Sequence, residues 1–80
     1  MLEPGQIEDW LRADLPCIHL AVEGDGHHFS AGIVSERFDG LSRVKRQQAV
    51  NAILKKHFDS GVLHALSMQT LTPDEWRARG

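Results

Sequence analysis

Hydrophobic positions along the chain follow a helical repeat in some stretches and an extended repeat in others. The longest regular stretch covers residues 38–58. Its apolar side chains recur at spacings of three and four, which places them on one stripe of a helix: Val50, Ile53, Leu54 and Phe58. Ser42 suits the N-cap position, because its hydroxyl can accept a hydrogen bond from a free amide of the first turn. We therefore predict a central helix that begins after Ser42 and ends near residues 59–61.

The N-terminal half predicts a helix followed by a hairpin. Residues 4–14 have helical spacing and begin at Pro4, whose missing amide costs nothing at the first helical position. Residues 17–23 and 28–35 alternate apolar and polar side chains, as half-buried strands do. The segment between them, Gly24-Asp25-Gly26, is a strong turn signal. The two strands should therefore pair as a β-hairpin.

The C-terminal part predicts one more strand and a short helix. Residues 62–70 alternate, with His64, Leu66 and Met68 on one face. Thr72 and Glu75 then match a capping box, ahead of a helix that carries Trp76. We assign both tryptophans of the chain, Trp10 and Trp76, to the core.

The resulting order of elements is αββαβα, which defines an α+β fold in one domain over residues 1–80. A single helix connects the second and third strands, so these two should run parallel while the hairpin is antiparallel. The expected architecture is a three-stranded mixed sheet covered by helices.

Composition and charge restrict the cellular compartment and the kinds of partner that we expect. The one cysteine excludes an intramolecular disulfide and favours a reducing compartment. No membrane-length apolar run and no signal peptide is visible, so a cytoplasmic protein without a membrane partner is expected. The net charge of −2 argues against strong non-specific binding to nucleic acid. The charged residues of the segment 43–56 are nonetheless all basic, so this segment forms either a solvated helix face or a docking surface for an acidic partner.

Five histidines are the main chemical resource of the sequence. A histidine at a strand start is more often a structural residue than a ligand, and a pair in a turn can equally be solvated. His27 and His28 are adjacent on an extended segment and point to opposite sides, so they cannot readily chelate one ion together. Cys17 has no predicted base nearby and is expected to be a buried, inert thiol. No paired carboxylates, nucleophile elbow or phosphate loop is visible, so an enzyme is not expected.

Four separated segments resemble the BolA family, and most closely its bacterial IbaG-like branch. They are GDGHHF at residues 24–29, FDGLSRVKRQQ at 38–48, LHALS at 63–67 and LTPDEW at 71–76. The resemblance covers nearly the whole chain and implies a fold similar to the class II KH domain, in agreement with the predicted order of elements.

The resemblance also implies a partner and a cofactor. Proteins of this family bind monothiol glutaredoxins, and the heterodimer can hold a bridged [2Fe-2S] cluster. Glutaredoxin and its glutathione supply thiolates, while the BolA-like protein supplies imidazole. His64 matches the family's C-terminal ligand, and His28 is the better match for the ligand from the hairpin loop, with His27 as a substitute. Two imidazoles cannot complete four ligands, so no metal is expected in the isolated protein, which would be a monomer or a weak homodimer.

Two functional hypotheses follow. The first is a non-enzymatic adaptor that shares the cluster through His64 and His28, in iron-sulfur trafficking or in iron, redox or stress signalling, with the basic helix helping to dock the partner. The alternative is a DNA-binding transcriptional regulator that contacts phosphates through Arg43, Lys45 and Arg46. The missing GxxG loop of KH domains and the negative net charge weigh against the alternative. A metal-free interaction module remains a third possibility.

Overall fold

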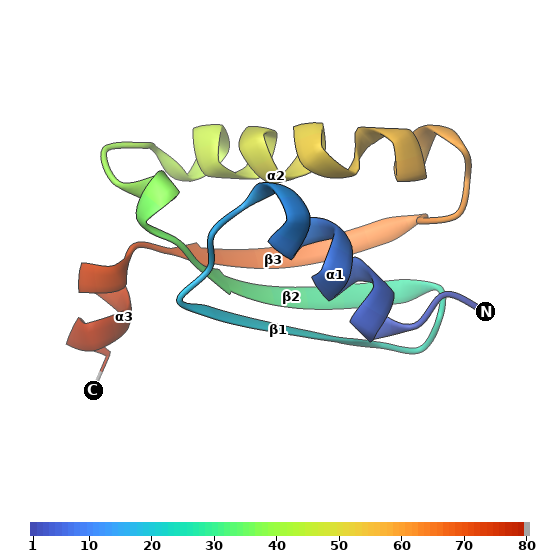
Figure 1. Ribbon diagram of the computed structural model, residues 1–80, viewed down its shortest axis with the longest axis horizontal. Helices are drawn as coiled ribbons and strands as arrows, with labels where there is room; N and C mark the ends of the chain where they lie inside the picture. Colours follow the sequence, from blue (N-terminus) through green and yellow to red (C-terminus); the bar gives the residue numbers. More distant parts are fainter. Residues whose placement is uncertain (80) are drawn as a thin grey trace.

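The computed structural model describes residues 1–79 and contains three helices and a three-stranded sheet (Figure 1). The helices are α1 (Pro4–Asp14), α2 (Arg43–Asp59) and α3 (Pro73–Ala78), and a 3-10 turn, η1 (Glu36–Phe38), precedes α2. The strands are β1 (His19–Gly24), β2 (His28–Val34) and β3 (Ala65–Leu71). The predicted order αββαβα is therefore confirmed.

The sheet has the order β1-β2-β3, with β2 in the centre. β1 and β2 are antiparallel, with Leu20 opposite Ile33, and β2 and β3 are parallel, with His28 opposite Ala65. This is the predicted mixed sheet, and it leaves β1 and β3 as the two edge strands.

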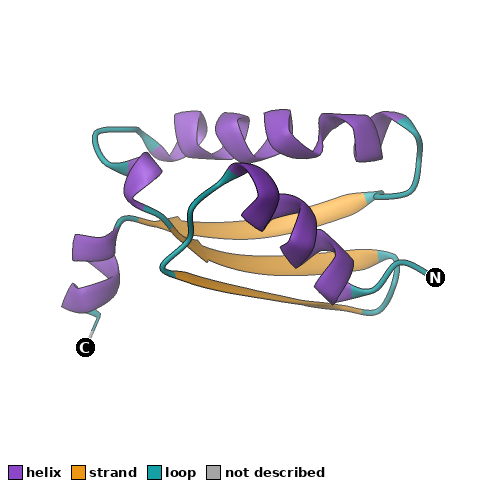
Figure 2. Cartoon of the chain, viewed as in Figure 1, coloured by secondary structure: helices purple, strands orange, loops and turns teal. Residues whose placement is uncertain are grey.

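Helices α1 and α2 pack on one face of the sheet and form the core there (Figure 2). The side chains at its centre are fully or almost fully buried and come from both helices, the strands and the connecting loops: Ile7, Leu11, Phe29, Ile33, Phe38, Val50, Leu54 and Leu63. The opposite face is largely exposed, as Ala21, Ser30 and Ser67 illustrate. The helices therefore cover the sheet on one side, and α3 lies at one end of it (Figure 1).

The helix boundaries follow the local signals in the sequence. The Ser42 hydroxyl accepts a hydrogen bond from the Lys45 amide at 3.3 Å and caps α2, as predicted. Gly61 lies just beyond the end of α2 with φ of +82°, a conformation that glycine adopts without strain. At α3, Thr72 and Glu75 form the predicted reciprocal capping box.

The largest differences from the prediction are the starts of two strands and one core assignment, while the other strand ends shift by a single residue. β3 begins at Ala65 rather than at residue 62, because the chain is still returning from α2 and the Leu63 amide donates to the His57 carbonyl. β1 begins at His19, and the preceding Ile18 is 59% exposed. Trp76 is 37% exposed, so it does not belong to the core. Trp10 is partly buried and packs against the core. No helix within residues 1–79 is both long enough and apolar enough to cross a bilayer.

A candidate ligand edge and a separate basic helix start

Three of the histidines, His27, His28 and His64, lie at one end of the sheet and are exposed. His28 is the first residue of β2 and pairs with Ala65, the residue that follows His64. Because β2 and β3 are parallel, the turn before β2 and the loop before β3 emerge at the same end of the molecule (Figure 1). His28 and His64 are 36 residues apart in the sequence. The fold therefore brings together the two segments from which the sequence predicted the metal ligands.

Asp25 shapes the turn that carries His27 and His28. Its Oδ1 accepts hydrogen bonds from the backbone amides of His27, at 2.9 Å, and His28, at 2.8 Å. These two amides, led by that of His28, hold the pKa of the Asp25 carboxyl below its usual range. Gly26 has φ of +98° inside the turn, which favours glycine. The backbone of the loop is thus ordered while its imidazoles stay open to solvent.

The remaining two histidines stack on tryptophans. His57, near the end of α2, stacks on Trp10 of α1 with ring centroids 3.5 Å apart. His19, at the start of β1, stacks on Trp76 of α3 with centroids 4.6 Å apart. Sequence reasoning missed both pairs, because the partners lie more than 45 residues apart and no local pattern links them. Among residues 1–79, neither stacked pair includes His27, His28 or His64.

The three histidines at this edge are of a residue type that can ligate a metal. Among residues 1–79, no group of three or more His, Cys, Asp or Glu side chains is placed to hold a metal. Exposed imidazoles can ligate iron, and a [2Fe-2S] cluster needs four protein or partner ligands. The three histidines at this edge are fewer than the four ligands that such a cluster needs.

Cys17 is the one cysteine of the chain and precedes β1. Its thiol is partly buried and donates to the Leu15 carbonyl at 3.4 Å. Burial raises the pKa of the Cys17 thiol, although the nearby Arg12 opposes that shift. The thiolate is disfavoured, which agrees with the predicted inert thiol.

The basic residues of the helix start do not behave alike. Arg43 and Lys45 are exposed in the first turn of α2, but Arg46 is buried. Its guanidinium donates to the Leu41 and Thr70 carbonyls and to the Glu75 carboxylate, at 2.7 Å for the shortest of these bonds. Arg46 is thus occupied within the fold, and the expectation that it contacts a partner or DNA does not fit its position.

The Arg46 side chain also explains the charge state of Glu75. Its hydrogen bond is the main reason why the pKa of the Glu75 carboxyl lies below the usual range, and the Thr72 amide adds to the effect. Sequence reasoning could not separate Arg46 from its basic neighbours, because the partner carboxylate lies 29 residues away.

The start of α2 lies at one end of the molecule, and the starts of β2 and β3, with His27, His28 and His64, lie at the other (Figure 1). Along α2, the axial rise from Lys45 to His57 is roughly 18 Å at 1.5 Å per residue. Lys55 and Lys56 lie at the histidine end of α2, and Lys55 pairs with Asp59. Any surface built on Arg43 and Lys45 is therefore separate from the ligand edge.

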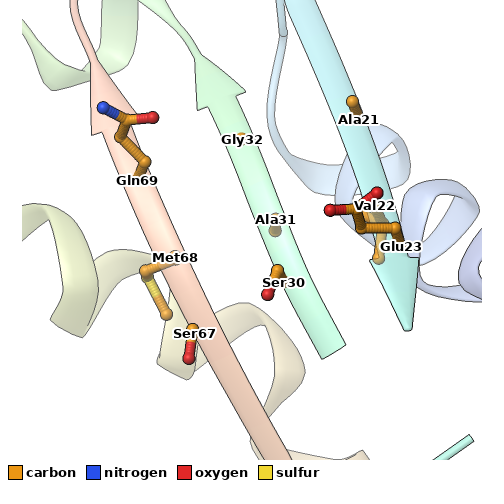
Figure 3. Close-up of a pocket in the computed structure, with 9 residues that line it drawn as sticks. All are labelled: Ala21, Val22, Glu23, Ser30, Ala31, Gly32, Ser67, Met68 and Gln69. Carbon is orange, nitrogen blue, oxygen red and sulfur yellow. The ribbon is translucent and has the colours of Figure 1, made fainter. Parts of the chain in front are cut away.

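A shallow hollow lies on the uncovered face of the sheet, between these two ends (Figure 3). Small residues form much of it and two longer polar side chains stand beside them: Ala21, Ser30, Gly32 and Ser67, with Glu23 and Gln69. The hollow holds no histidine or cysteine, so it adds nothing to the ligand set.

The chain belongs to the BolA family: the family model described as BolA-like protein matches residues 11–75. Among curated proteins, the acid stress protein IbaG of Escherichia coli strain K12 is 40% identical over 75 residues, which cover 94% of this chain and 89% of the relative. The resemblance stated from the sequence is therefore confirmed.

Solved structures agree with this assignment. A Bol-like protein from Babesia bovis has a TM-score of 0.85 at 34% identity and is covered over 94% of its length by 99% of this chain. A BolA homologue from Coxiella burnetii has a TM-score of 0.83 at 36% identity, with 96% of this chain and 99% of the homologue covered. The α+β fold is thus that of the BolA-like proteins.

Proposed function

We propose that the protein is a non-enzymatic adaptor that binds a monothiol glutaredoxin and shares a bridged [2Fe-2S] cluster with it. The observation that carries this proposal is the convergence of His28 and His64 at one exposed end of the parallel pair β2–β3. Family membership supports the choice of partner, because the motifs around both histidines are those by which the chain resembles other BolA-like proteins.

In this proposal His64 and His28 hold the iron, with His27 as a substitute for His28. Neutral imidazole raises the potential of an iron-sulfur cluster relative to thiolate ligation. The Asp25 turn orders the backbone on which His28 sits, so the loop donor is presented from a defined position. Glutaredoxin and glutathione supply the thiolates, and the cluster serves iron-sulfur trafficking or iron, redox and stress signalling.

The test is to mix the protein with a cluster-loaded monothiol glutaredoxin and to record visible absorption, circular dichroism and size-exclusion elution. Wild type should give a one-to-one complex with a new spectrum. His64→Ala and His28→Ala should alter or abolish that spectrum while the far-ultraviolet spectrum of the fold stays unchanged. A changed spectrum with His27→Ala and an unchanged one with His28→Ala would make His27, rather than His28, the ligand from the hairpin loop.

His19→Ala is the matched control, because it removes an imidazole at the opposite end of the sheet, where His19 stacks on Trp76. It should leave the cluster spectrum unchanged. A spectrum insensitive to His64→Ala would remove His64 from the ligand set. No complex with wild type would refute the adaptor and give priority to the DNA-binding alternative, whose exposed contacts reduce to Arg43 and Lys45.

A further inference from the structure

The two edges of the sheet are protected to different degrees. At β1, the backbone amide of Val22 donates to the Glu8 carboxylate of α1 at 3.0 Å, and the strand carries the charged Glu23. β3 has the sequence ALSMQTL, with no charge, proline or glycine in seven residues. Exposed strand edges without such features pair readily with another extended chain. β3 is therefore the edge suited to accept a partner.

The open part of this edge can be located from hydrogen bonds at its C-terminal end. The Leu71 carbonyl accepts from the Ser35 amide, beyond the end of β2, so it points inward. The Thr70 carbonyl accepts from Arg46 Nη1 at 3.1 Å, so it points outward. Because backbone groups alternate along a strand, those of Leu66 and Met68 also point outward. Arg46 occupies the edge at Thr70, which leaves Leu66 and Met68 as the pairing positions.

A groove beside this edge indicates the chemistry of the partner. It runs between β3 and the first turns of α2 and is lined by Arg43 and Gln47 on the helix and Met68 and Thr70 on the strand. Arg43 is exposed, and within residues 1–79 no carboxylate lies at ion-pair distance from it. An acidic side chain of a strand added beside this groove can pair with the Arg43 guanidinium.

We propose that the β3 edge binds an extended peptide segment of another protein by strand addition. The segment pairs with the backbone of Leu66 and Met68 and places a carboxylate against Arg43. A second copy of this chain fits less well, because β3 itself offers no acidic residue to Arg43. The proposal is independent of the cluster-sharing function, since it needs neither metal nor glutaredoxin.

The probe is a capped seven-residue peptide of alternating valine and threonine with one glutamate, added to the metal-free, nitrogen-15-labelled full chain at low salt. The amide resonances of Leu66 and Met68 should shift and exchange more slowly with solvent. A peptide with lysine in place of glutamate should bind about two- to fivefold more weakly, as expected for one exposed ion pair. A peptide with N-methylated amides along the pairing edge should not bind.

Two charge reversals on α2 test the role of Arg43. Arg43→Glu should invert the preference between the glutamate and lysine peptides. Lys45→Glu makes the same charge change in the same turn at a residue that does not line the groove, so it should keep the wild-type preference.

The proposal is overturned by any of four results. The first two are Leu66 and Met68 amides that stay unshifted with both charged peptides at millimolar concentration, and equally tight binding of the N-methylated peptide. Shifts of these amides with protein concentration alone would assign the edge to a second copy. Shifts caused by single-stranded oligothymidylate and by no peptide would assign the groove to nucleic acid.

Discussion

His57 shows how the role of a single residue depends on a neighbour distant in sequence. Its ring stacks on Trp10 with an interplanar angle of 8°, which joins α2 to α1. Burial lowers the pKa of the His57 imidazole from its ordinary value of 6.5, and the adjacent Lys56 charge lowers it further. The folded protein therefore favours the neutral ring.

This shift predicts the direction of a pH effect on stability. Below about pH 6.5 the unfolded chain binds more protons at His57 than the folded chain does. The stability that the neutral ring contributes is present above that pH and is lost as the pH falls through the lower pKa of the folded state. Between about pH 7.5 and about pH 5.5, wild type should therefore lose more unfolding free energy than His57→Gln, measured by urea denaturation.

His27→Gln is the control for this comparison, because His27 lies exposed in the hairpin turn. Its stability should follow that of wild type over the same pH range. Parallel pH profiles for wild type and His57→Gln would contradict the role assigned to the Trp10–His57 stack.

At the scale of elements, Arg46 joins three parts of the fold. From α2 its guanidinium reaches the Leu41 carbonyl before the helix, the Thr70 carbonyl in β3 and the Glu75 carboxylate in α3. The side chain is 9% exposed, whereas that of Glu75 is 47% exposed. The carbonyl bonds thus matter more to stability than the half-exposed ion pair does.

Arg46→Met should lower the free energy of unfolding by about 1–3 kcal/mol, because it leaves the buried Thr70 carbonyl without its donor. Glu75→Gln should cost less, since the amide oxygen can still accept from Arg46. Chemical denaturation of both variants checks this order. Lys45→Met, an exposed change next to Arg46, should be close to wild type; an equal loss in Lys45→Met and Arg46→Met would show that the buried bonds are not the cause.

At the scale of the whole molecule, helix α2 separates the two candidate functional surfaces. His27, His28 and His64 lie at the end of the sheet where β2 and β3 begin, and Arg43 and Lys45 lie at the other end of α2 (Figure 1). The molecule is small and elongated, with a radius of gyration of 12.2 Å and a longest dimension of 35 Å. Cluster sharing and phosphate contact, if both occur, should therefore be separable by mutation.

We expect the double variant Arg43→Gln, Lys45→Gln to form the glutaredoxin complex with the wild-type cluster spectrum, because neither side chain lies near the ligand edge. The same variant should weaken any oligonucleotide binding seen at low salt, with a shallower dependence on salt concentration. His64→Ala should do the reverse, altering the spectrum and leaving oligonucleotide binding unchanged. A spectral change in the double variant would contradict this separation of the two ends.

The sequence by itself determined the elements and much of their packing. Periodicity located α1 to the residue, and the caps at Ser42 and Thr72 marked where α2 and α3 begin, because capping depends on residues within one turn. The single helical crossover between β2 and β3 was enough to predict their parallel pairing. Motifs near His28 and His64 identified the family, and the parallel pair then explains why those two segments meet.

Tertiary structure alone decided which of several similar residues have which role. Arg46 and Lys45 are adjacent basic residues in the sequence, and only the distant Glu75 and Thr70 make the first a buried structural side chain. His57 and His19 were distinguished from His27, His28 and His64 only by their stacks on Trp10 and Trp76. The start of β3 at Ala65 likewise depended on how far the chain had to travel back from α2. Local patterns record short-range propensities, whereas burial and long-range contacts exist only after the chain has folded.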